Sequence, residues 1–307
     1  MSLYTDWRNL PPAARNTVAA LGNFDGVHRG HVHLLDTLRM ARPDHPLSVV
    51  TFDPHPRMLF RPQDPSFRLM LPDVRAAALA EQSVDHVFQV PFDAEFSRLS
   101  ADRFVNDVLV NSLGVAHVAC GADFAFGHRR TGNIECLETL LAPHGIGLTI
   151  VPQLSDEGGP ISSSRIRRLL QEGYPERAAE ELGRPWSITG PVMHGDQRGR
   201  LLGFPTANIP LTQHLEPARG VYAARVMLPD GRVIPGVANI GRRPTINDGR
   251  ESRLEVHLFD FNEDLYGQTL SVALIALLRE EKRFSGLDEL KAQIAADAAQ
   301  ARAILAH

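Results

Sequence analysis

Short apolar runs separated by helical patterns fill the first part of the chain, up to about Gly183. Each run has four to six residues, is rich in Val, Ile, Leu or Phe, and is bounded by polar, Gly or Pro residues. This pattern is typical of buried strands. The runs are 18–21, 47–52, 86–90, 115–120 and 148–151. The stretches 72–83 and 100–113 lie between them and have helical character, with a proline near the first turn and a serine at the N-cap, respectively.

After Gly183 helical patterns no longer separate the apolar runs. Gly- and Pro-rich turns join candidate strands at 186–189, 221–228, 233–239, 254–259 and 270–277. Residues 229–231 (Pro-Asp-Gly) are a hairpin signal, because proline presets the turn and glycine tolerates positive φ. The tail after Gly286 is helical by propensity and period. We expect an α/β domain over 1–183, with a doubly wound, Rossmann-like parallel sheet, and a small antiparallel β-barrel with a C-terminal helix over 184–307.

Composition excludes several classes of function. The 307 residues, 43% hydrophobic and 22% charged, suit an ordinary soluble protein of two domains. No apolar run approaches the ~20 residues of a membrane helix, and the N-terminus lacks a secretory pattern. Two cysteines are too few for a disulfide framework or a four-ligand zinc site, and they favour the cytoplasm. A net charge of −4 argues against a general nucleic-acid partner, while the oligomeric state stays open.

A glycine-rich segment with two histidines follows the first predicted strand and opens a helix. The glycines would let backbone amides approach a ligand, and the helix N-terminus favours an anion. His28 and His31 are three positions apart, so one helical turn could aim both imidazoles at one phosphate and stabilise charge developing on its oxygens. We therefore expect an ATP-using nucleotidyltransferase site over 22–31. Its other expected ATP-binding residues are Gly22, Phe24, Asp25, Gly26 and Gly30.

Two other interpretations of this segment are open. The histidines could be ordinary surface residues beside a turn, or they could form a metal-binding pair. The strand, glycine loop and helix occur together with the H-x-G-H spacing, which favours the phosphate site. No third metal ligand is evident nearby, which disfavours the metal pair.

A serine- and arginine-rich segment, 161–167, follows the fifth predicted strand and starts a helix. Hydroxyls, amides and an arginine fork at a helix N-terminus suit the β- and γ-phosphates of ATP. A capped surface helix with basic residues would show the same pattern. The candidates are Ser163, Ser164 and Arg167.

Two more loops follow predicted strands at the edge where such sheets bind ligands. In the loop 121–127, two phenylalanines could line a pocket for a flat ring, or they could belong to the plain core. The loop 51–56 is polar and rigid, and its chemistry alone assigns it no role. The residues singled out in these two loops are Asp53, His55, Pro56, Asp123, Phe124 and Phe126.

A second glycine-rich, basic segment, 190–200, opens the C-terminal half. Spare amides and arginines could wrap a triphosphate, although the G-K-[ST] ending of a P-loop is missing. Thr206 and Asn208 alternate on a short extended segment, so both could face one side and share a magnesium ion. The candidates that precede them are Gly195, Arg198, Gly199, Arg200 and Pro205.

Glu255 and His257 lie on one face of a predicted strand further along the chain. A carboxylate there could take a proton from an attacking hydroxyl. The pattern alone favours an ordinary exposed strand carboxylate.

In this order the motifs resemble those of the prokaryotic bifunctional riboflavin kinase/FMN adenylyltransferases, also called FAD synthetases. The resemblance covers about Val18 to Leu305. The N-terminal signature is Gly-x-Phe-Asp-Gly-x-His-x-Gly-His over 22–31, joined by 51–56, 121–127 and 161–167. The C-terminal signature is Gly-Arg-x-Leu-Gly-Phe-Pro-Thr-Ala-Asn over 199–208, followed by Gly220-Val221-Tyr222, Pro244-Thr245, Glu255-x-His257 and Asp264-Leu265-Tyr266-Gly267.

The resemblance implies ATP as co-substrate in both halves, Mg²⁺, and riboflavin, FMN and FAD as substrates and products. In the kinase half, 184–307, Glu255 matches the general base that activates the ribityl 5′-hydroxyl of riboflavin. Thr206 and Asn208 match the magnesium and nucleotide ligands, and the arginine- and glycine-rich segment before them matches the ATP loop.

In the adenylyltransferase half, 1–183, the resemblance implies attack of the FMN phosphate on the α-phosphate of ATP, with pyrophosphate leaving. His28 and His31 match residues that bind and stabilise the ATP phosphates, and Arg167 matches the arginine of a Ser-Ser-Thr-x-Ile-Arg motif. The loops 51–56 and 121–127 match flavin-binding loops.

The chain departs from the family pattern at two positions. Ser164 stands where the family usually has threonine, and it keeps the hydroxyl. Ile246 stands where the family usually has an aromatic residue, which could weaken flavin packing in the kinase half without touching the phosphoryl chemistry.

Three rival interpretations are open. Only one half could be active, although all matched acidic, basic and hydroxyl positions are present in both. A flavin-sensing, transcription-linked protein would need a DNA-reading element, and none remains unassigned. Another H-x-G-H transferase would not need the Pro-Thr-Ala-Asn motif and Glu255 of the second half.

Overall fold

The computed structural model describes residues 1–194, 204–243 and 251–306. The chain forms two compact units, of which the first comprises Met1–Asp64 and Pro72–Ile161. The second comprises Pro65–Leu71 and Ser162–His307, so a short segment from within the first half belongs to it. The functional division into 1–183 and 184–307 lies at a different position in the chain and stays a prediction.

The N-terminal unit is built on a six-stranded sheet in which every pair is parallel. This confirms the predicted doubly wound sheet. Its strands, in the spatial order β1-β4-β3-β2-β5-β6, are β1 (Ser2–Tyr4), β4 (His86–Pro91), β3 (Leu47–Asp53), β2 (Val18–Leu21), β5 (His117–Gly121) and β6 (Gly147–Val151). Because β2 lies between β3 and β5, the chain reverses its direction of winding there. The crevice at the carboxyl ends of β2 and β5 is where such folds bind ligands.

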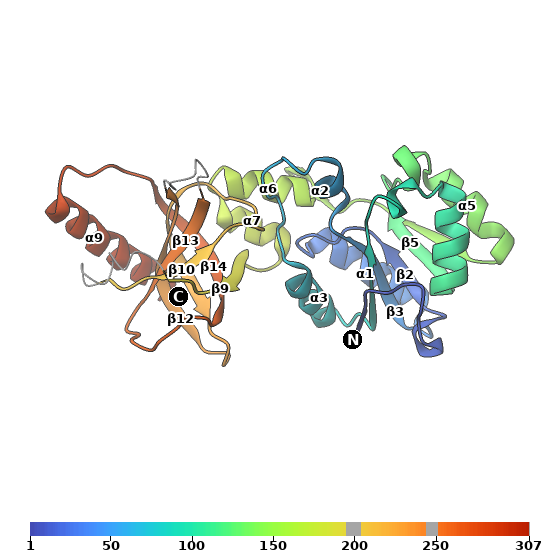
Figure 1. Cartoon of the computed structure of the whole chain (residues 1–307), viewed down its shortest axis with the longest axis horizontal. Coiled ribbons are helices and arrows are strands. Elements are labelled where there is room, and N and C mark those ends of the chain that lie inside the picture. Colours follow the sequence, from blue (N-terminus) through green and yellow to red (C-terminus); the bar gives the residue numbers. More distant parts are fainter. Residues whose placement is uncertain (195–203, 244–250, 307) are drawn as a thin grey trace. The chain divides into compact units, whose positions relative to one another are not determined.

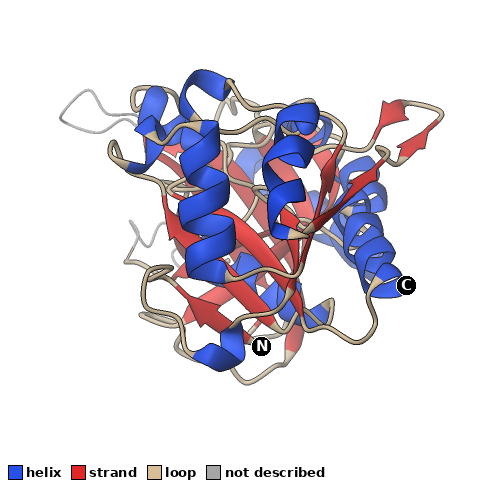
Figure 2. Cartoon of the chain, turned by 90° about the vertical axis from the view of Figure 1, so that its right-hand side faces the viewer, coloured by secondary structure: helices blue, strands red, loops and turns tan. Residues whose placement is uncertain are grey.

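Helices cover both faces of this sheet (Figures 1 and 2). On one face lie α1 (Arg29–Ala41) and α3 (Pro72–Glu81). On the other face, α5 (Ile134–Leu141) and the π-helix η3 (Phe104–Leu113) pack into a common apolar core with the strands. Smaller elements complete the unit: η1 (Pro12–Ala14), α2 (Pro56–Phe60), η2 (Phe96–Arg98), α4 (Ala101–Arg103), η4 (His128–Arg130), η5 (Ala142–His144), β7 (Ser155–Asp156) and β8 (Gly159–Pro160).

The second unit contains α6 (Ser163–Gln171), α7 (Pro175–Leu182) and a six-stranded antiparallel sheet. In spatial order the strands are β10 (Ala207–Pro210), β13 (Glu251–Leu258), β12 (Val233–Arg243), β11 (Gly220–Met227), β14 (Thr269–Glu280) and β9 (Ser187–Pro191). The Met193 amide donates to the Asn208 carbonyl at 2.8 Å, which nearly closes the sheet into the predicted barrel. The turn at 229–231 joins β11 to β12 as predicted, with Gly231 at φ +87°.

The helix α9 (Leu287–Leu305) follows the barrel and packs against one of its faces (Figure 1). Val221, Ala223 and Val237 from β11 and β12 form an apolar cluster with Ala301 and Leu305. Residues paired directly across an antiparallel sheet share a face. The face that carries Val221 therefore also carries Asn239, its partner on β12.

Candidate functional site

The predicted phosphate loop lies directly after β2, at the switch point of the parallel sheet. Its backbone is strained, since Phe24 and Val27 adopt positive φ angles of 52° and 41°. For a β-branched residue such as valine this region is a clear outlier, and strain of this kind concentrates at functional sites. A Cβ on Gly22 would lie 3.1 Å from the buried Phe24 ring, and Gly26 has φ +91°. Both glycines are therefore needed for the shape of the loop.

His28 and His31 cap the start of α1 reciprocally. The His31 amide donates to His28 Nδ1, and the His28 amide donates to His31 Nδ1, both at 3.3 Å. The rings stack with centroids 3.6 Å apart. Because each Nδ1 accepts a backbone N–H, each neutral ring carries its proton on Nε2. Both imidazoles therefore present an N–H donor at the helix N-terminus, where a phosphate is favoured.

Gly30 is required beneath this pair. A Cβ there would lie 3.1 Å from Nδ1 of His28 and 3.4 Å from the Ile161 carbonyl oxygen. The spacing H-x-G-H thus has a packing reason as well as a chemical one, because any side chain between the histidines would displace the His28 ring.

A buried arginine that the sequence interpretation missed supports the loop from α3. Arg75 is 5% exposed, and its Nη1 donates to the Asn23 carbonyl at 3.2 Å while its Nη2 donates to Gln89 Oε1 at 3.1 Å. The Thr51 hydroxyl donates to the same Asn23 carbonyl at 3.0 Å. These contacts come from α3, β3 and β4, so the loop is fixed by elements distant in sequence, and no local pattern marks Arg75.

The loop after β3 starts at Asp53, which is joined to Pro54 by a cis peptide bond. His55 caps α2, its Nδ1 accepting the Arg57 amide at 3.1 Å, and Pro56 is the first residue of the helix. The helix ends at Phe60, whose side chain is 64% exposed and meets Phe92 edge-on at 6.0 Å. An exposed aromatic ring near the carboxyl edge of the sheet is a flat apolar surface that the sequence interpretation did not single out.

The loop after β5 places its two aromatic residues differently. The rings of Phe124 and Phe126 are stacked with centroids 5.7 Å apart. Phe126 is buried in the core of the unit, whereas Phe124 is half-buried and packs against that core. Asp123 is exposed and accepts the Gln153 side-chain amide at 3.3 Å. Phe124 and Asp123 are therefore the residues of this loop with surface to offer a ligand.

The serine–arginine segment begins α6 in the second unit. Ser162 is the N-cap, its hydroxyl accepting the Arg165 amide at 3.2 Å, so Ser163 and Ser164 occupy the first helical positions. Arg167 Nε donates to the Phe67 carbonyl at 2.8 Å. This confirms that the segment starts a helix, as the sequence predicts.

On the barrel, strand register assembles the second set of candidates. Glu255 on β13 lies directly opposite Asn208 on β10 and directly opposite Asn239 on β12. Paired residues share a face, so the carboxylate lies between two carboxamides. The row continues through Val221 on β11 to Arg279 on β14. Asn239 was missed by the sequence interpretation, because only the register connects it with Glu255.

Asn208 has an oxygen suited to a ligand. The residue is 7% exposed, and its Nδ2 donates to the Thr206 carbonyl at 3.3 Å. Its Oδ1 is buried and has no hydrogen-bond partner among the described residues. A buried carboxamide oxygen without a donor is costly. A cation or an incoming N–H would satisfy it.

Five of the predicted kinase-half positions lie outside the described residues or at their border. Gly195, Arg198, Gly199 and Arg200 lie outside them, as does Ile246. Pro205 is described, and its carbonyl accepts His257 Nδ1–H at 2.8 Å. Within the described ranges, no group of three or more His, Cys, Asp or Glu side chains is placed to hold a metal ion.

The turn with the sequence Asp-Leu-Tyr-Gly supports the chain just before the glycine-rich segment. Asp264 Oδ1 accepts the Tyr266 amide at 3.0 Å, and Gly267 donates its amide to the Val192 carbonyl at 3.0 Å. The Tyr266 ring stacks on His194 with centroids 3.9 Å apart. This motif therefore fixes the position from which the segment 195–203 departs.

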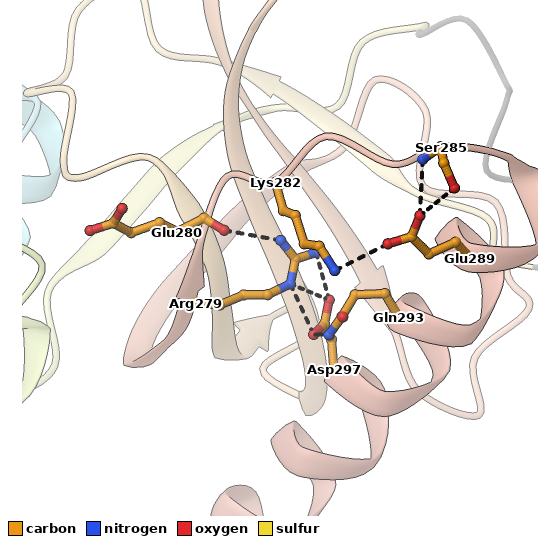
Figure 3. A network of polar contacts seen from close by, with 7 residues as sticks. All are labelled: Arg279, Glu280, Lys282, Ser285, Glu289, Gln293 and Asp297. Carbon is orange, nitrogen blue, oxygen red and sulfur yellow. Dashed lines mark hydrogen bonds and ion pairs between the residues drawn. The ribbon is translucent and has the colours of Figure 1, made fainter.

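A buried polar network connects the row on the barrel to α9 (Figure 3). Arg279 Nε and Nη2 donate to the Asp297 carboxylate at 2.8 to 3.1 Å, and the Gln293 side-chain amide donates to it at 2.8 Å. The Asp297 side chain is 5% exposed. On the connecting segment, Glu289 accepts the amide and the hydroxyl of Ser285. The network thus holds α9 against the face that carries Glu255.

The cysteines add no reactive group to the first unit's crevice. Burial raises the pKa of the Cys120 thiol to about 12, with a smaller contribution from the charge of Asp123. The thiol therefore stays protonated at neutral pH and packs in the core as an apolar side chain. Cys120 and Cys136 are both free thiols.

No helix within the described residues is long and apolar enough to cross a membrane.

Comparison with known proteins gives two family matches in tandem. Residues 10–165 match the family model described as FAD synthetase, and residues 182–305 match the one described as Riboflavin kinase. The bifunctional riboflavin kinase/FMN adenylyltransferase of Escherichia coli (strain K12) is 42% identical over 305 residues, which cover 98% of this chain and 97% of the relative. The protein of the same name from Pseudomonas fluorescens is 42% identical over 308 residues, covering 100% and 98%.

A solved structure, named as a macrolide-efflux protein from Streptococcus pneumoniae, is similar over its whole length. Its TM-score is 0.85 at 31% sequence identity, and the match covers 96% of both chains. Full-length identity to the two bacterial enzymes and the tandem family matches agree on both halves. The chain belongs to the family of bifunctional riboflavin kinase/FMN adenylyltransferases.

Proposed function

We propose that this chain makes FAD from riboflavin in two ATP-dependent steps, each carried by its own set of residues. Residues 184–307 phosphorylate riboflavin to FMN, and residues 1–183 transfer the adenylyl group of ATP to FMN. The observation that carries the proposal is that two different phosphate-handling arrangements are each built within one compact unit: the reciprocally capped pair His28 and His31, and the in-register row Asn208, Glu255 and Asn239.

In adenylyl transfer, a phosphate oxygen of FMN attacks the α-phosphorus of ATP and pyrophosphate leaves. The nucleophile is already ionised at neutral pH, so the step needs charge stabilisation more than a base. His28 and His31 supply it through Nε2–H donors fixed in direction by the capping bonds at Nδ1. Gly22, Phe24, Asp25, Gly26 and Gly30 shape the loop that receives the triphosphate, and Ser163, Ser164 and Arg167 bind its outer phosphates.

For the flavin of this first site we propose the loops after β3 and β5. The residues are those of the sequence prediction, Asp53, His55, Pro56, Asp123, Phe124 and Phe126. Phe60 joins them, since its ring is largely exposed beside Phe92. A flat, apolar isoalloxazine ring would bury apolar area against such a surface. Phe126 acts from the core by supporting Phe124.

In the kinase step, the ribityl 5′-hydroxyl of riboflavin attacks the γ-phosphorus of ATP and ADP leaves. Glu255 takes the hydroxyl proton. The flanking carboxamides of Asn208 and Asn239 hold it in a fixed row on a rigid sheet. Gly195, Arg198, Gly199, Arg200 and Pro205 belong to the segment we assign to the nucleotide phosphates.

We assign a magnesium ion to Thr206 and Asn208. A hydroxyl and a carboxamide are oxygen ligands, and Mg²⁺ in nucleotide sites binds through few protein oxygens together with the phosphates. The buried Oδ1 of Asn208, which has no donor among the described residues, fits such a role. When bound, the ion would offset negative charge on the nucleotide.

The partners in this proposal are small molecules only: ATP, riboflavin, FMN and FAD. We place the enzyme in the cytoplasm, where its two thiols would remain reduced, in keeping with their unpaired state. Its oligomeric state is left open.

The test is chromatography of the flavins formed when the purified chain meets riboflavin, ATP and magnesium. We expect FMN to form first and FAD to follow. FMN alone would contradict the role given to His28 and His31. No product, with FMN also failing as a substrate, would contradict both assignments.

A further inference from the structure

Residues 65–71, called here the crossing segment, belong to the second compact unit although the chain before and after them belongs to the first. Nothing in the assignments above uses this segment. Its sequence, Pro-Ser-Phe-Arg-Leu-Met-Leu, has no catalytic motif. What it touches in the second unit gives it a role.

The crossing segment is anchored at successive residues. The Ser66 hydroxyl donates to the Thr212 carbonyl at 2.8 Å, and the Leu215 amide donates to the Arg68 carbonyl at 2.9 Å. The next residue, Leu69, is fully buried. Backbone groups held in this way have one conformation, so the segment offers a rigid support rather than a flexible loop.

A second group of anchors comes from the start of the barrel. Trp186 Nε1 donates to the Leu69 carbonyl at 2.8 Å, and Arg184 Nη2 contacts the Met70 sulfur at 3.5 Å. Trp186 is 2% exposed. The segment therefore lies between bonds to the chain at 212–215 and bonds to the chain at 184–186.

Phe67 lies in the middle of this support and holds Arg167 in two ways. Its carbonyl accepts Arg167 Nε at 2.8 Å, and the guanidinium carbon lies 5.0 Å from the centroid of its ring. The Phe67 side chain is 6% exposed, so the ring cannot turn away readily. Both partners are neutral, and they orient the guanidinium without cancelling its charge.

The contrast with the other arginine of the same helix shows what this arrangement achieves. Arg165 Nε lies 2.5 Å from a carboxylate oxygen of Glu181, with the two side chains 12% and 3% exposed. That pair fixes α6 against α7 and uses the positive charge of Arg165 internally. Arg167 is instead held by a carbonyl and a ring, and the bond at Nε leaves the Nη groups to meet an anion.

We propose that Phe67 is a positioning residue for Arg167 in adenylyl transfer, acting through ring and carbonyl contacts that aim the guanidinium before ATP arrives. The inference rests on the proposed role of Arg167 as an ATP phosphate ligand. A free arginine side chain has several rotatable bonds that binding must order, and a preformed orientation lowers that cost. The crossing segment thereby makes a residue of the first half of the chain responsible for a phosphate ligand on α6.

A double-mutant cycle on the full chain tests this proposal. The variants are Phe67→Leu, which removes the ring, Arg167→Met, and their combination. The readout is kcat/KM for ATP in FAD formation from supplied FMN, with riboflavin kinase activity and Tm as checks of folding. The matched control replaces Arg168, the exposed neighbour on α6, by Met in the same cycle.

We expect Phe67→Leu to lower kcat/KM roughly three- to tenfold, with kinase activity within about twofold of wild type. In the Arg167→Met background the same change should have almost no further effect, because the group that Phe67 positions is gone. With Arg168→Met the two effects should multiply. Should Phe67→Leu prevent folding, Phe67→Met, which fills more of the space, enters the same cycle.

Two outcomes would overturn the proposal in different ways. If the losses of Phe67→Leu and Arg167→Met multiply as they do with Arg168→Met, Phe67 acts through general packing and the positioning role is wrong. If Arg167→Met leaves FAD formation unchanged, the ligand role of Arg167 itself fails, and this inference fails with it.

Discussion

The two units build their candidate phosphate sites from different kinds of structure. In the first, His28, His31 and the three glycines lie within ten consecutive positions, and a loop and a helix N-terminus present them. In the second, Asn208, Glu255 and Asn239 come from three neighbouring strands and meet only through register. The first site supplies N–H donors, and the second supplies a carboxylate and carboxamide oxygens.

The difference follows the chemistry proposed for each half. A phosphate nucleophile needs no base, so a loop of amides and imidazoles suffices in the first unit. A hydroxyl nucleophile must lose a proton, so the second unit needs a carboxylate held rigidly beside it. Strands hold such a group more firmly than a loop does.

The largest expected effect separates the two sites by their base. Replacing Glu255 by glutamine should lower the rate of FMN formation by roughly 10²–10⁴-fold, because the hydroxyl loses its proton acceptor. FAD formation from supplied FMN should remain within about twofold of wild type. Both rates come from flavin chromatography on the same protein preparation. Equal losses in the two reactions of a folded variant would contradict the separation.

A reciprocal effect is expected from the histidine pair. His28→Ala or His31→Ala should lower FAD formation roughly 10²–10³-fold, since each removes a fixed donor and also the cap that orients the other ring. FMN formation should be spared. His33 on the same helix is exposed, and His33→Ala is the matched control, expected to change neither rate. Loss of activity in that control would point to damage of α1 instead.

A smaller effect sharpens the description of the barrel site. Asn239→Ala removes one of the carboxamides beside Glu255, and we expect FMN formation to fall roughly tenfold, the scale of one hydrogen bond to a charged group. FAD formation should not change. Rescue by Asn239→Gln is not expected, because the longer side chain moves the amide within the row. An unchanged kcat in Asn239→Ala would remove this residue from the site.

The smallest effect contrasts the acid sensitivity of the two units. Burial is the main cause that lowers the pKa of His117, with Arg42 adding to it, and burial lowers the pKa of His86. The unfolded chain takes up these protons below the ordinary value of 6.5 while the folded chain resists, so stability falls as the pH drops through that value. In the second unit, hydrogen bonds from Ser285 lower the pKa of Glu289 from 4.5 to about 2, so its contribution is present above 4.5 and lost only below it.

Thermal unfolding between about pH 7.5 and pH 5.5 checks this contrast. We expect His117→Gln to lose less Tm over this interval than wild type, because one of the two resisting groups is gone. Glu289→Gln should parallel wild type. Parallel curves for all three proteins would show that His117 does not contribute to acid sensitivity.

Most of the fold could be predicted from apolar patterns, because the strands of both sheets are local runs with clear ends. The edge strand β1 (Ser2–Tyr4) was missed, since three residues at a sheet edge are too short to show a period. The stretch 100–113 was correctly predicted as helical with Ser100 as its cap, but not as a short α-helix followed by a π-helix. That local change of winding has no pattern in the sequence.

The sites divide in the same way. The segment 22–31 is readable because its chemistry is contiguous, and the structure adds only how the rings cap one another. Asn239, Arg75 and Phe67 could not be found from the sequence, because each gains its meaning from strand register or from a segment that joins another unit. Glu255 could be singled out by resemblance, whereas its two asparagine neighbours form a row only in the folded barrel.

The most direct test of two separable sites is complementation between two inactive variants. Glu255→Gln and the double variant His28→Ala/His31→Ala are each given riboflavin, ATP and magnesium, alone and mixed, and the flavins are separated by chromatography. The account predicts little FAD from either protein alone and abundant FAD from the mixture, since FMN made by one is used by the other. Failure of the mixture to form FAD, with both proteins folded and FMN released, would show that the two sets of residues do not act as separate sites.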